Sequence, residues 1–279
     1  SLLRLNLPLD KGHFITGGRN KMSLVIFLIF LILLWQGAYW LGVDVLGVFM
    51  EYAMPSPVGV WERFVDLCSD GSIFMALGNS LLRGIVGYAI AVLIGFVLGL
   101  LMNRIRYLQK NLKPLVLGIQ TLPSVCWVPF AILWFGIPKT SIFSSAILFV
   151  VVVGSTFGIA ISVDNAIKNV QPIYIKAALT IGADKKQLYT RVILPASLPE
   201  LVSGLKQGWS FAWRALMAGE VMTTSVGLGQ TLIIGRDLAD INQVMLVMIV
   251  IIIVGIAIDK CIFSVIEKKL LTKRGLIKE

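Results

Sequence analysis

Residues 165–199 read NAIKNVQPIYIKAALTIGADKKQLYTRVILPASLP. This stretch is polar and bounded by prolines, whereas the sequence on either side of it is almost entirely apolar. Its small residues, charges and prolines are placed too regularly for a passive linker. We therefore expect this stretch to be the part of the molecule through which the protein is driven.

Local signals in the stretch predict two short helices. Residues 173–181 can form a helix with small side chains on one side, and Gly182 permits a sharp turn after it. Asp184 is the predicted N-cap of a second helix over 185–191, and Pro195 is expected to stop that helix before the next apolar run. A short helix held between two turns is suited to insertion into a groove of a partner protein.

The composition of the chain is typical of a membrane protein. Of its 279 residues, 57% are hydrophobic and 14% are charged, and the mean hydropathy is +0.87, whereas a soluble domain carries about 25% charged residues. His13 is the only histidine, which excludes a metal site built on histidine. The three cysteines (Cys68, Cys126 and Cys261) form no CxxC pair, so neither a zinc site nor a disulfide framework is indicated.

Six apolar runs of the length that a bilayer crossing requires predict an all-α membrane protein with six transmembrane helices. They cover residues 22–43, 79–103, 115–136, 140–163, 201–226 and 241–258. Before them lies a polar, basic tail over 1–22. Between the first two runs, a segment started by prolines predicts an amphipathic helix along the outer interface, with apolar side chains at Val58, Trp61, Phe64, Val65 and Leu67.

The distribution of positive charge predicts the orientation of the spans. An even number of spans puts both termini on one side, and the segments assigned to that side hold 19 of the 25 Lys and Arg residues. One of these segments, 104–113, is predicted as a short basic loop. The outer segments hold Arg63, Lys139 and Arg236. By the positive-inside rule both termini are cytoplasmic, and topology and anionic lipid account for the net charge of +10 without nucleic acid.

Two of the predicted spans carry packing signals. Pro123 and Pro129 remove backbone donors from the third span and should kink or break it. In the second span, small residues recur at every fourth position and form one groove in which another helix can approach closely: Gly87, Ala91, Gly95 and Gly99.

The fifth predicted span holds charged side chains and is the candidate for lining a pathway. At 100° per residue, Trp209, Trp213 and Glu220 fall on one stripe, and Arg214 points away from it. A carboxylate at membrane depth faces protein or water rather than lipid, so Glu220 either lines the pathway, makes a structural hydrogen bond or lies near the outer interface. Arg214 either assists an anion or pairs with a helix end, and Arg83 has the same two readings.

Several catalytic motifs are missing from the sequence. No GxxxxGK[ST] occurs, so the chain cannot cradle and hydrolyse ATP by itself, and it has neither a nucleophile elbow nor HExxH. A gradient-driven carrier would need ion-coupling carboxylates and commonly an inverted repeat. An intramembrane enzyme would need a converging set of nucleophiles or metal ligands. Both remain as alternatives that the sequence disfavours.

The segment 176–199, KAALTIGADKKQLYTRVILPASLP, resembles the EAA loop of ABC importer permeases. The pattern of that loop is EAA, three residues, Gly, nine residues, Ile, one residue and Leu-Pro. Lys176 stands where the family usually has glutamate. The segments MPSPVGVW, NSLLRGIVGYAIAVLIGFVLGLLM and LPSVCWVPFAILWFGI also resemble the nitrate, sulfonate and taurine branch of these permeases. The loop positions that match are Ala177, Ala178, Gly182, Val192, Leu194 and Pro195.

The resemblance implies a type I ABC importer permease fold. Residues 23–78 would hold the first transmembrane helix and the outer interfacial helix, 79–266 a five-helix core with a cytoplasmic coupling loop over 164–200, and 267–279 a basic tail. It also implies the surface that contacts an ATPase subunit: Asp184, Lys185, Lys186, Gln187, Leu188 and Tyr189.

The same resemblance implies the partners and the function. The permease would pair with a second permease copy, bind two ATPase subunits and receive solute from an external binding protein. It would be no enzyme and carry no cofactor or metal, because ATP and Mg would bind to the ATPase subunits. The solute would be a sulfonate, taurine or nitrate, with bicarbonate, riboflavin or a thiamine precursor as alternatives.

Overall fold

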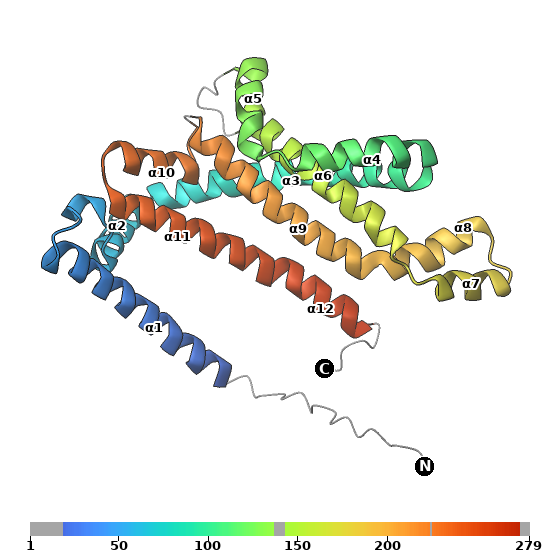
Figure 1. The fold of residues 1–279 in the computed structure, drawn as a ribbon, viewed down its shortest axis with the longest axis horizontal. Helices are drawn as coiled ribbons and strands as arrows, with labels where there is room; N and C mark the ends of the chain where they lie inside the picture. The colour runs from blue at the N-terminus through green and yellow to red at the C-terminus, as the bar shows by residue number, and fades with distance from the viewer. Residues whose placement is uncertain (1–18, 137–142, 224, 274–279) are drawn as a thin grey trace, which may run out of the picture.

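The computed structural model describes residues 19–136, 143–223 and 225–273, and within these ranges the chain is nearly all helical, without strands. Long helices lie side by side in one bundle (Figure 1): α3 (Ser72–Arg104), α6 (Ser145–Lys168), α9 (Leu194–Val221) and α11 (Ile241–Ile258). The helix α6 packs against both α3 and α9. More than half of its apolar window is buried, 56%, so α6 is the centre of the bundle.

Within the described residues, four helices are long and apolar enough to cross a membrane, and a bent pair makes a fifth span if it is counted as one. The four run over Met22–Val45, Ser72–Arg104, Ser145–Lys168 and Ile241–Leu270. They match the predicted first, second, fourth and sixth spans, of which the fourth begins outside the described residues. The predicted fifth span is α9, which has 28 residues but carries charged side chains along its length.

Two of these spans are extended by π-helical turns. The helix α1 (Arg19–Tyr39) continues into η1 (Trp40–Val45), and α11 continues through η5 (Asp259–Phe263) into α12 (Ser264–Lys273).

The predicted third span is the bent pair. It consists of α4 (Arg106–Gln120), η3 (Ser124–Trp127) and α5 (Val128–Phe135), with an angle of 99° between its halves. The break lies at Pro123, whose backbone is extended, as the prolines predicted. Pro129 stands in the first turn of α5, where no backbone donor is required. As a result α5 projects from the bundle (Figure 1).

The prediction of a basic loop over 104–113 is wrong. Only Ile105 leaves the helical conformation between α3 and α4, and the basic residues that follow it belong to α4. The reason is packing, because Leu112 and Val116 lie one helical turn apart on α4 and contact Met102 and Ala160. The prediction relied on the basic residues of 104–113 and did not consider this apolar stripe.

The predicted groove on α3 is confirmed. Its four small residues are all buried and face α6. A Cβ added to Gly87 would lie 2.7 Å from Val151, and one added to Gly99 would lie 2.6 Å from the carbonyl oxygen of Ala160. The two helices therefore pack at a distance that only small side chains allow.

The predicted amphipathic helix is α2 (Pro57–Ser69), preceded by the 3-10 turn η2 (Glu51–Ala53). The side chain of Ser56 caps it by accepting the N–H of Gly59 at 3.0 Å. Val58, Trp61 and Val65 are exposed, while the helix packs against α11. Its position along a membrane interface stays a prediction.

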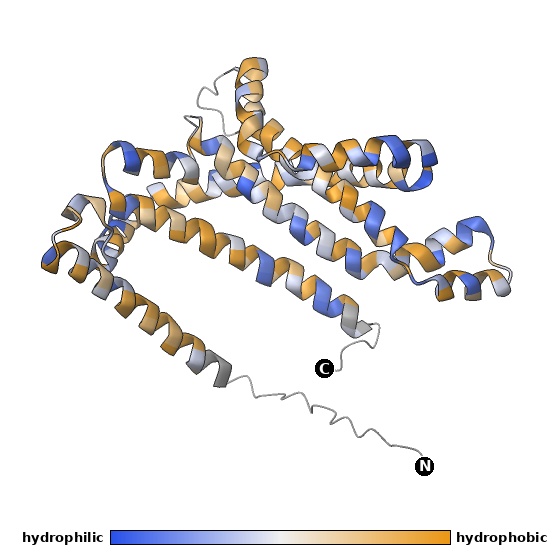
Figure 2. Ribbon diagram, viewed as in Figure 1, coloured by the Kyte–Doolittle hydropathy of each residue, from blue (hydrophilic) through white to orange (hydrophobic). Residues whose placement is uncertain are grey.

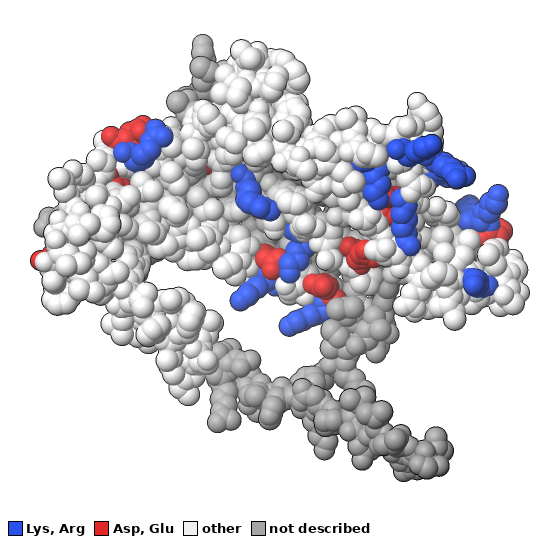
Figure 3. Space-filling view, in the orientation of Figure 1, with Lys and Arg blue, Asp and Glu red and all other residues white. Residues whose placement is uncertain are grey.

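Apolar residues cover the long helices, and polar residues gather at the two ends of the bundle (Figure 2). Lys and Arg side chains are concentrated at the end that holds α4, α7 (Pro172–Thr180) and α8 (Lys185–Gln187), as Figure 3 shows. We call this the basic end. The opposite end holds α2 and α10 (Leu228–Asp237).

Candidate functional site

The coupling segment, residues 172–193, begins with α7 and a tight turn. Gly182 has φ +81°, a conformation that favours glycine. Its N–H donates to the carbonyl of Leu179 at 3.0 Å, and the N–H of Ala183 donates to the carbonyl of Ala178 at 3.0 Å. These two bonds form a Schellman motif that satisfies the last carbonyls of the helix. The predicted turn at Gly182 is confirmed.

A capping box starts the next helix. The N–H of Gln187 donates to the carboxylate of Asp184 at 2.6 Å, and the N–H of Asp184 donates to the amide oxygen of Gln187 at 3.2 Å. Asp184 is therefore the N-cap of α8, as predicted, and Gln187 is the second member of the box.

The prediction that Pro195 ends this helix is wrong, and so is that of a separate helix over 185–191. The chain runs from α8 through the π-helical turns of η4 (Leu188–Ile193) directly into α9. In a π-helix each N–H donates to the carbonyl five residues earlier, one residue more than in an α-helix. In η4 the N–H of Leu194 donates in this way to the carbonyl of Tyr189. Pro195 then stands in the first turn of α9, directly after the π-helical turns, whose hydrogen bonding differs from that of an α-helix.

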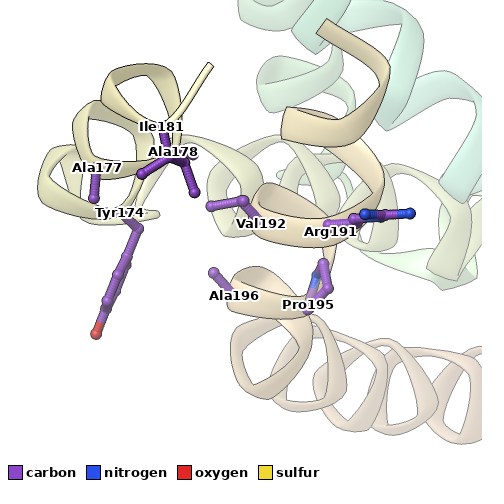
Figure 4. A pocket seen from close by; sticks show the side chains of 8 residues that line it. All are labelled: Tyr174, Ala177, Ala178, Ile181, Arg191, Val192, Pro195 and Ala196. Atoms are coloured by element: carbon purple, nitrogen blue, oxygen red, sulfur yellow. The ribbon is translucent and has the colours of Figure 1, made fainter. Parts of the chain in front are cut away.

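Four of the six matching motif residues line one hollow of about 630 Å³ (Figure 4). Ala177 and Ala178 line it from α7, and Val192 and Pro195 line it from η4 and the start of α9. These small side chains leave a hollow on one side of the contact between α7 and the following helix, while Ile175 and Ile193 pack in one apolar cluster. Of the other two motif residues, Gly182 makes the turn that follows α7, and Leu194 lines a different hollow.

Large apolar side chains on α7 and its turn are exposed, and sequence reasoning missed them. Ile181 is 85% exposed, and the exposed set also includes Ile173, Tyr174 and Leu179. In contrast, Leu188 is half-buried against the cluster that contains Val170 and Ile193. Their apolar character within an otherwise polar segment could have predicted this exposed apolar surface.

Cations surround the coupling segment. A second hollow of about 560 Å³ is lined by Arg104, Lys185, Lys186, Tyr189 and Thr190. In the described part of the chain no carboxylate pairs with any of its three cations. This face of the basic end is therefore positively charged.

Behind the coupling segment lies a buried carboxylate that the sequence analysis did not single out. Asp164 of α6 is fully buried, and its carboxylate accepts Lys113 of α4 at 2.6 Å and Lys168 at 2.7 Å. The amide nitrogen of Asn103 on α3 donates to it at 3.3 Å, and the amide oxygen of Asn103 accepts the hydroxyl of Tyr189 at 3.4 Å. The cluster joins α3, α4, α6 and η4.

The predicted stripe on α9 faces the core. Trp209 and Trp213 are buried and stacked, with ring centroids 6.0 Å apart. Glu220 is also fully buried, and its carboxylate accepts Arg83 of α3 at 2.9 Å and Ser80 at 2.7 Å. Of the three roles predicted for Glu220, the structure shows the structural hydrogen bond.

The same carboxylate caps α10. It accepts the N–H of Gly229 at 3.0 Å, and the Ser80 hydroxyl accepts the N–H of Leu228 at 2.8 Å. A Cβ at Gly227 or Gly229 would lie 2.5 Å from Glu220. The GLG sequence therefore lets a helix N-terminus close over a buried carboxylate.

Arg214 lies on the exposed side of α9, away from this stripe as predicted. Its Nε donates to the carbonyl of Ser210 at 3.0 Å, and its guanidinium lies 5.2 Å from the ring centroid of Phe211. In the described ranges no group of three or more His, Cys, Asp or Glu side chains is arranged to hold a metal ion.

A family of known proteins shares this architecture. Residues 91–272 match the model of the "Binding-protein-dependent transport system inner membrane component" family, which is well over half of the chain. The chain belongs to this family. It is a multi-pass membrane protein and the permease subunit of an ABC importer, not an enzyme.

Curated relatives cover most of this permease. It is 28% identical over 238 residues to the putative aliphatic sulfonates permease SsuC of Bacillus subtilis, with 85% of this chain and 84% of SsuC covered. It is 29% identical to the taurine permease TauC of Escherichia coli (68% and 69% covered). The nitrate import permease NrtB of Synechocystis is 25% identical (75% and 78%), and the formylaminopyrimidine permease ThiX of Halalkalibacterium halodurans is 28% identical (73% and 77%).

Solved structures share the fold of this permease. A chain of an amino acid ABC transporter has a TM-score of 0.62 at 14% identity, with 74% of this chain and 97% of that chain covered. A chain of the MetNI methionine ABC transporter in an inward-facing conformation has a TM-score of 0.59 at 20% identity (71% and 96% covered). The fold is therefore that of type I ABC importer permeases.

Proposed function

We propose that two copies of this permease import a small anion that an external binding protein delivers, and that the coupling segment of each copy docks on one of two ATPase subunits. ATP and Mg bind to those subunits, and the permease carries no cofactor. The basic end and both termini face the cytoplasm, in keeping with the positive-inside rule.

The observation that carries this proposal is the surface of the coupling segment. The side chain of Ile181, at the C-terminal end of α7, is 85% exposed. Lys185 and Lys186 follow at the start of α8. An apolar side chain surrounded by charges is the usual composition of an interface centre with its rim.

The continuity of α8, η4 and α9 supplies a route for movement. When the ATPase subunits close on ATP, the two coupling segments would move together. Because each segment continues into α9 without a loop, the movement would pass to the centre of the bundle as a rigid rotation. The spans would then alternate between an outward-open and an inward-open packing, two states whose populations nucleotide sets.

Substitution of Ile181 tests the docking role. We expect Ile181→Asp to abolish co-purification with the ATPase and ATP-driven uptake, because a carboxylate replaces the apolar centre of the interface. Leu238→Asp, at a side chain that is 71% exposed at the opposite end, is the matched control and should retain both. Unchanged assembly and uptake in Ile181→Asp would refute the coupling surface.

The substrate class is tested with the whole transporter. The relatives named for sulfonates, taurine and nitrate support an anion, and ThiX supports formylaminopyrimidine as a second candidate. Proteoliposomes with the ATPase and the cognate binding protein should take up ethanesulfonate, taurine or nitrate in an ATP-dependent way. Uptake of formylaminopyrimidine alone would favour the second candidate.

A further inference from the structure

A cavity of about 310 Å³ lies at the break of the bent pair, where α4 gives way to η3. The break lines it with Gln120, Thr121 and Ser124, the centre of the bundle with Gly154, and α9 with Phe211 and Arg214. This volume is in the range of small-molecule sites. A discontinuous helix inside a membrane is tolerated where its backbone lines such a cavity.

Room for the break comes from Gly154 of α6. A Cβ at this position would lie 2.8 Å from the Cβ of Ala215 and 3.3 Å from the Cβ of Ser124. The glycine therefore lets the broken segment and α9 approach α6 together. This close approach brings side chains about 90 positions apart in sequence to one cavity.

Arg214 differs from the other cations in the middle of these helices. Arg83 pairs with Glu220 at 2.9 Å and Lys206 pairs with Asp259 at 3.2 Å, whereas no carboxylate in the described part of the chain pairs with Arg214. A cation at membrane depth normally faces an anionic partner, protein or water. Here the nearest contacts are the Ser210 carbonyl and the Phe211 ring.

Polar groups around the guanidinium complete the site. The Gln120 amide and the Ser124 hydroxyl lie on the cavity wall and are partly exposed. Thr121 also lines the wall, although its hydroxyl donates to the carbonyl of Gly118 at 2.7 Å. None of the described residues that line the cavity is acidic. The wall thus offers one cation and two neutral donors, which is the composition that recognises an oxyanion.

We infer that this cavity is an anion subsite of the transport path, in which the Arg214 guanidinium pairs with the oxygens of a sulfonate or nitrate and Gln120 and Ser124 donate further hydrogen bonds. This inference rests on the proposed function, because it assumes that the permease moves an anion. Phe211 holds the guanidinium from one side through a cation–π contact and leaves its terminal nitrogens for the solute.

Charged thiol reagents test the subsite without transport. In a full transporter in nanodiscs, with Cys68, Cys126 and Cys261 replaced by Ala, we expect Ser124→Cys to react faster with a methanethiosulfonate that carries a sulfonate than with one that carries a trimethylammonium group. The preference should be retained in Arg214→Lys, lost in Arg214→Gln, and unchanged in Arg236→Gln, since Arg236 pairs with Asp237 on the exposed surface of α10.

Two results would overturn the inference. One is a preference for the anionic reagent that persists in Arg214→Gln, since another charge would then set it. The other is a cysteine at position 124 that reacts with neither reagent, because the cavity would then be closed to solutes. Size-exclusion profiles and co-purification of the ATPase, measured on the same samples, identify any variant that fails to fold. If Arg214→Gln fails to fold, the test is made on Ser124→Cys with Arg214 in place: taurine or nitrate should slow its labelling, and labelling that neither anion slows would overturn the inference.

Uptake separates this inference from the proposed function. Loss of a charge-assisted hydrogen bond predicts a fall in anion uptake of roughly tenfold or more in Arg214→Gln, with partial recovery in Arg214→Lys. If the unsubstituted transporter moves no anion, the proposed function fails. If it moves an anion and Arg214→Gln moves it equally well, only the subsite fails.

Discussion

At the scale of single residues, two buried carboxylates organise the two ends of the bundle. Glu220 joins α3, α9 and α10 at one end, and Asp164 joins α3, α4 and α6 at the other. A buried charge is stable only when it is paired and hydrogen-bonded. Both residues therefore constrain which helices can lie next to one another.

Asp164→Asn should lower the stability of the permease. The substitution leaves Lys113 and Lys168 facing a neutral amide, and breaking a buried ion pair costs about 3–5 kcal/mol; the partial exposure of both lysines puts our expectation at about 3 kcal/mol. Thermal unfolding in detergent measures the change. Asp237→Asn is the control, because its side chain is 61% exposed and pairs only with Arg236. Equal melting temperatures for the two variants would contradict a structural role for Asp164.

At the scale of elements, the contact between α3 and α6 depends on the absence of large side chains from one face of α3. The small residues of α3 allow backbone atoms of the two helices to approach within van der Waals distance. This contact sets the position of α6, and α6 in turn supports α9 and the break of the bent pair. A change in the groove should therefore disturb the whole bundle.

Gly99→Leu should prevent assembly of a native bundle, because its Cβ would lie 2.6 Å from the Ala160 carbonyl oxygen and 2.7 Å from Val163. Gly78→Leu on the same helix is the matched control, since nothing lies within 4 Å of a Cβ at that position. We expect a monodisperse size-exclusion peak for Gly78→Leu and aggregation for Gly99→Leu. A monodisperse Gly99→Leu protein would show that the helices can separate without loss of the fold.

At the scale of the whole molecule, charge is distributed unequally between the two ends. The basic end carries clustered Lys and Arg residues, while the opposite end combines Arg63 and Arg236 with acidic partners (Figure 3). A bilayer with a cytoplasmic side that retains positive charge orients such a bundle in one direction. The coupling segment would then face the compartment that contains ATP.

Cysteine labelling tests this orientation. In the background without native cysteines, Lys110→Cys and Asp237→Cys place exposed thiols at opposite ends of the bundle, both outside the coupling segment. We expect a membrane-impermeant maleimide to label Asp237→Cys in intact cells and Lys110→Cys only in inside-out vesicles. Labelling of Lys110→Cys in intact cells would reverse the proposed topology.

Features that depend on local order and periodicity can be predicted from the sequence alone. Gly182 and Asp184 form their turn and cap because both motifs are closed by bonds within a few residues. The groove of α3 follows from a repeat of four, and the break at Pro123 follows from a missing donor. Apolar length located the spans, since a helix must satisfy its own backbone in a membrane.

Pairings between distant residues depend on the tertiary structure. Arg83 and Glu220 are 137 positions apart, and Lys113 and Asp164 are 51 apart, so no local pattern links them. The tertiary structure also decided that the helix continues past Pro195, because a π-helical turn before the proline adjusts the hydrogen bonding. The exposed cation Arg214 and the broken segment meet only because the bundle folds α4, α6 and α9 around one cavity. Packing, which sequence periodicity does not contain, brings these groups together.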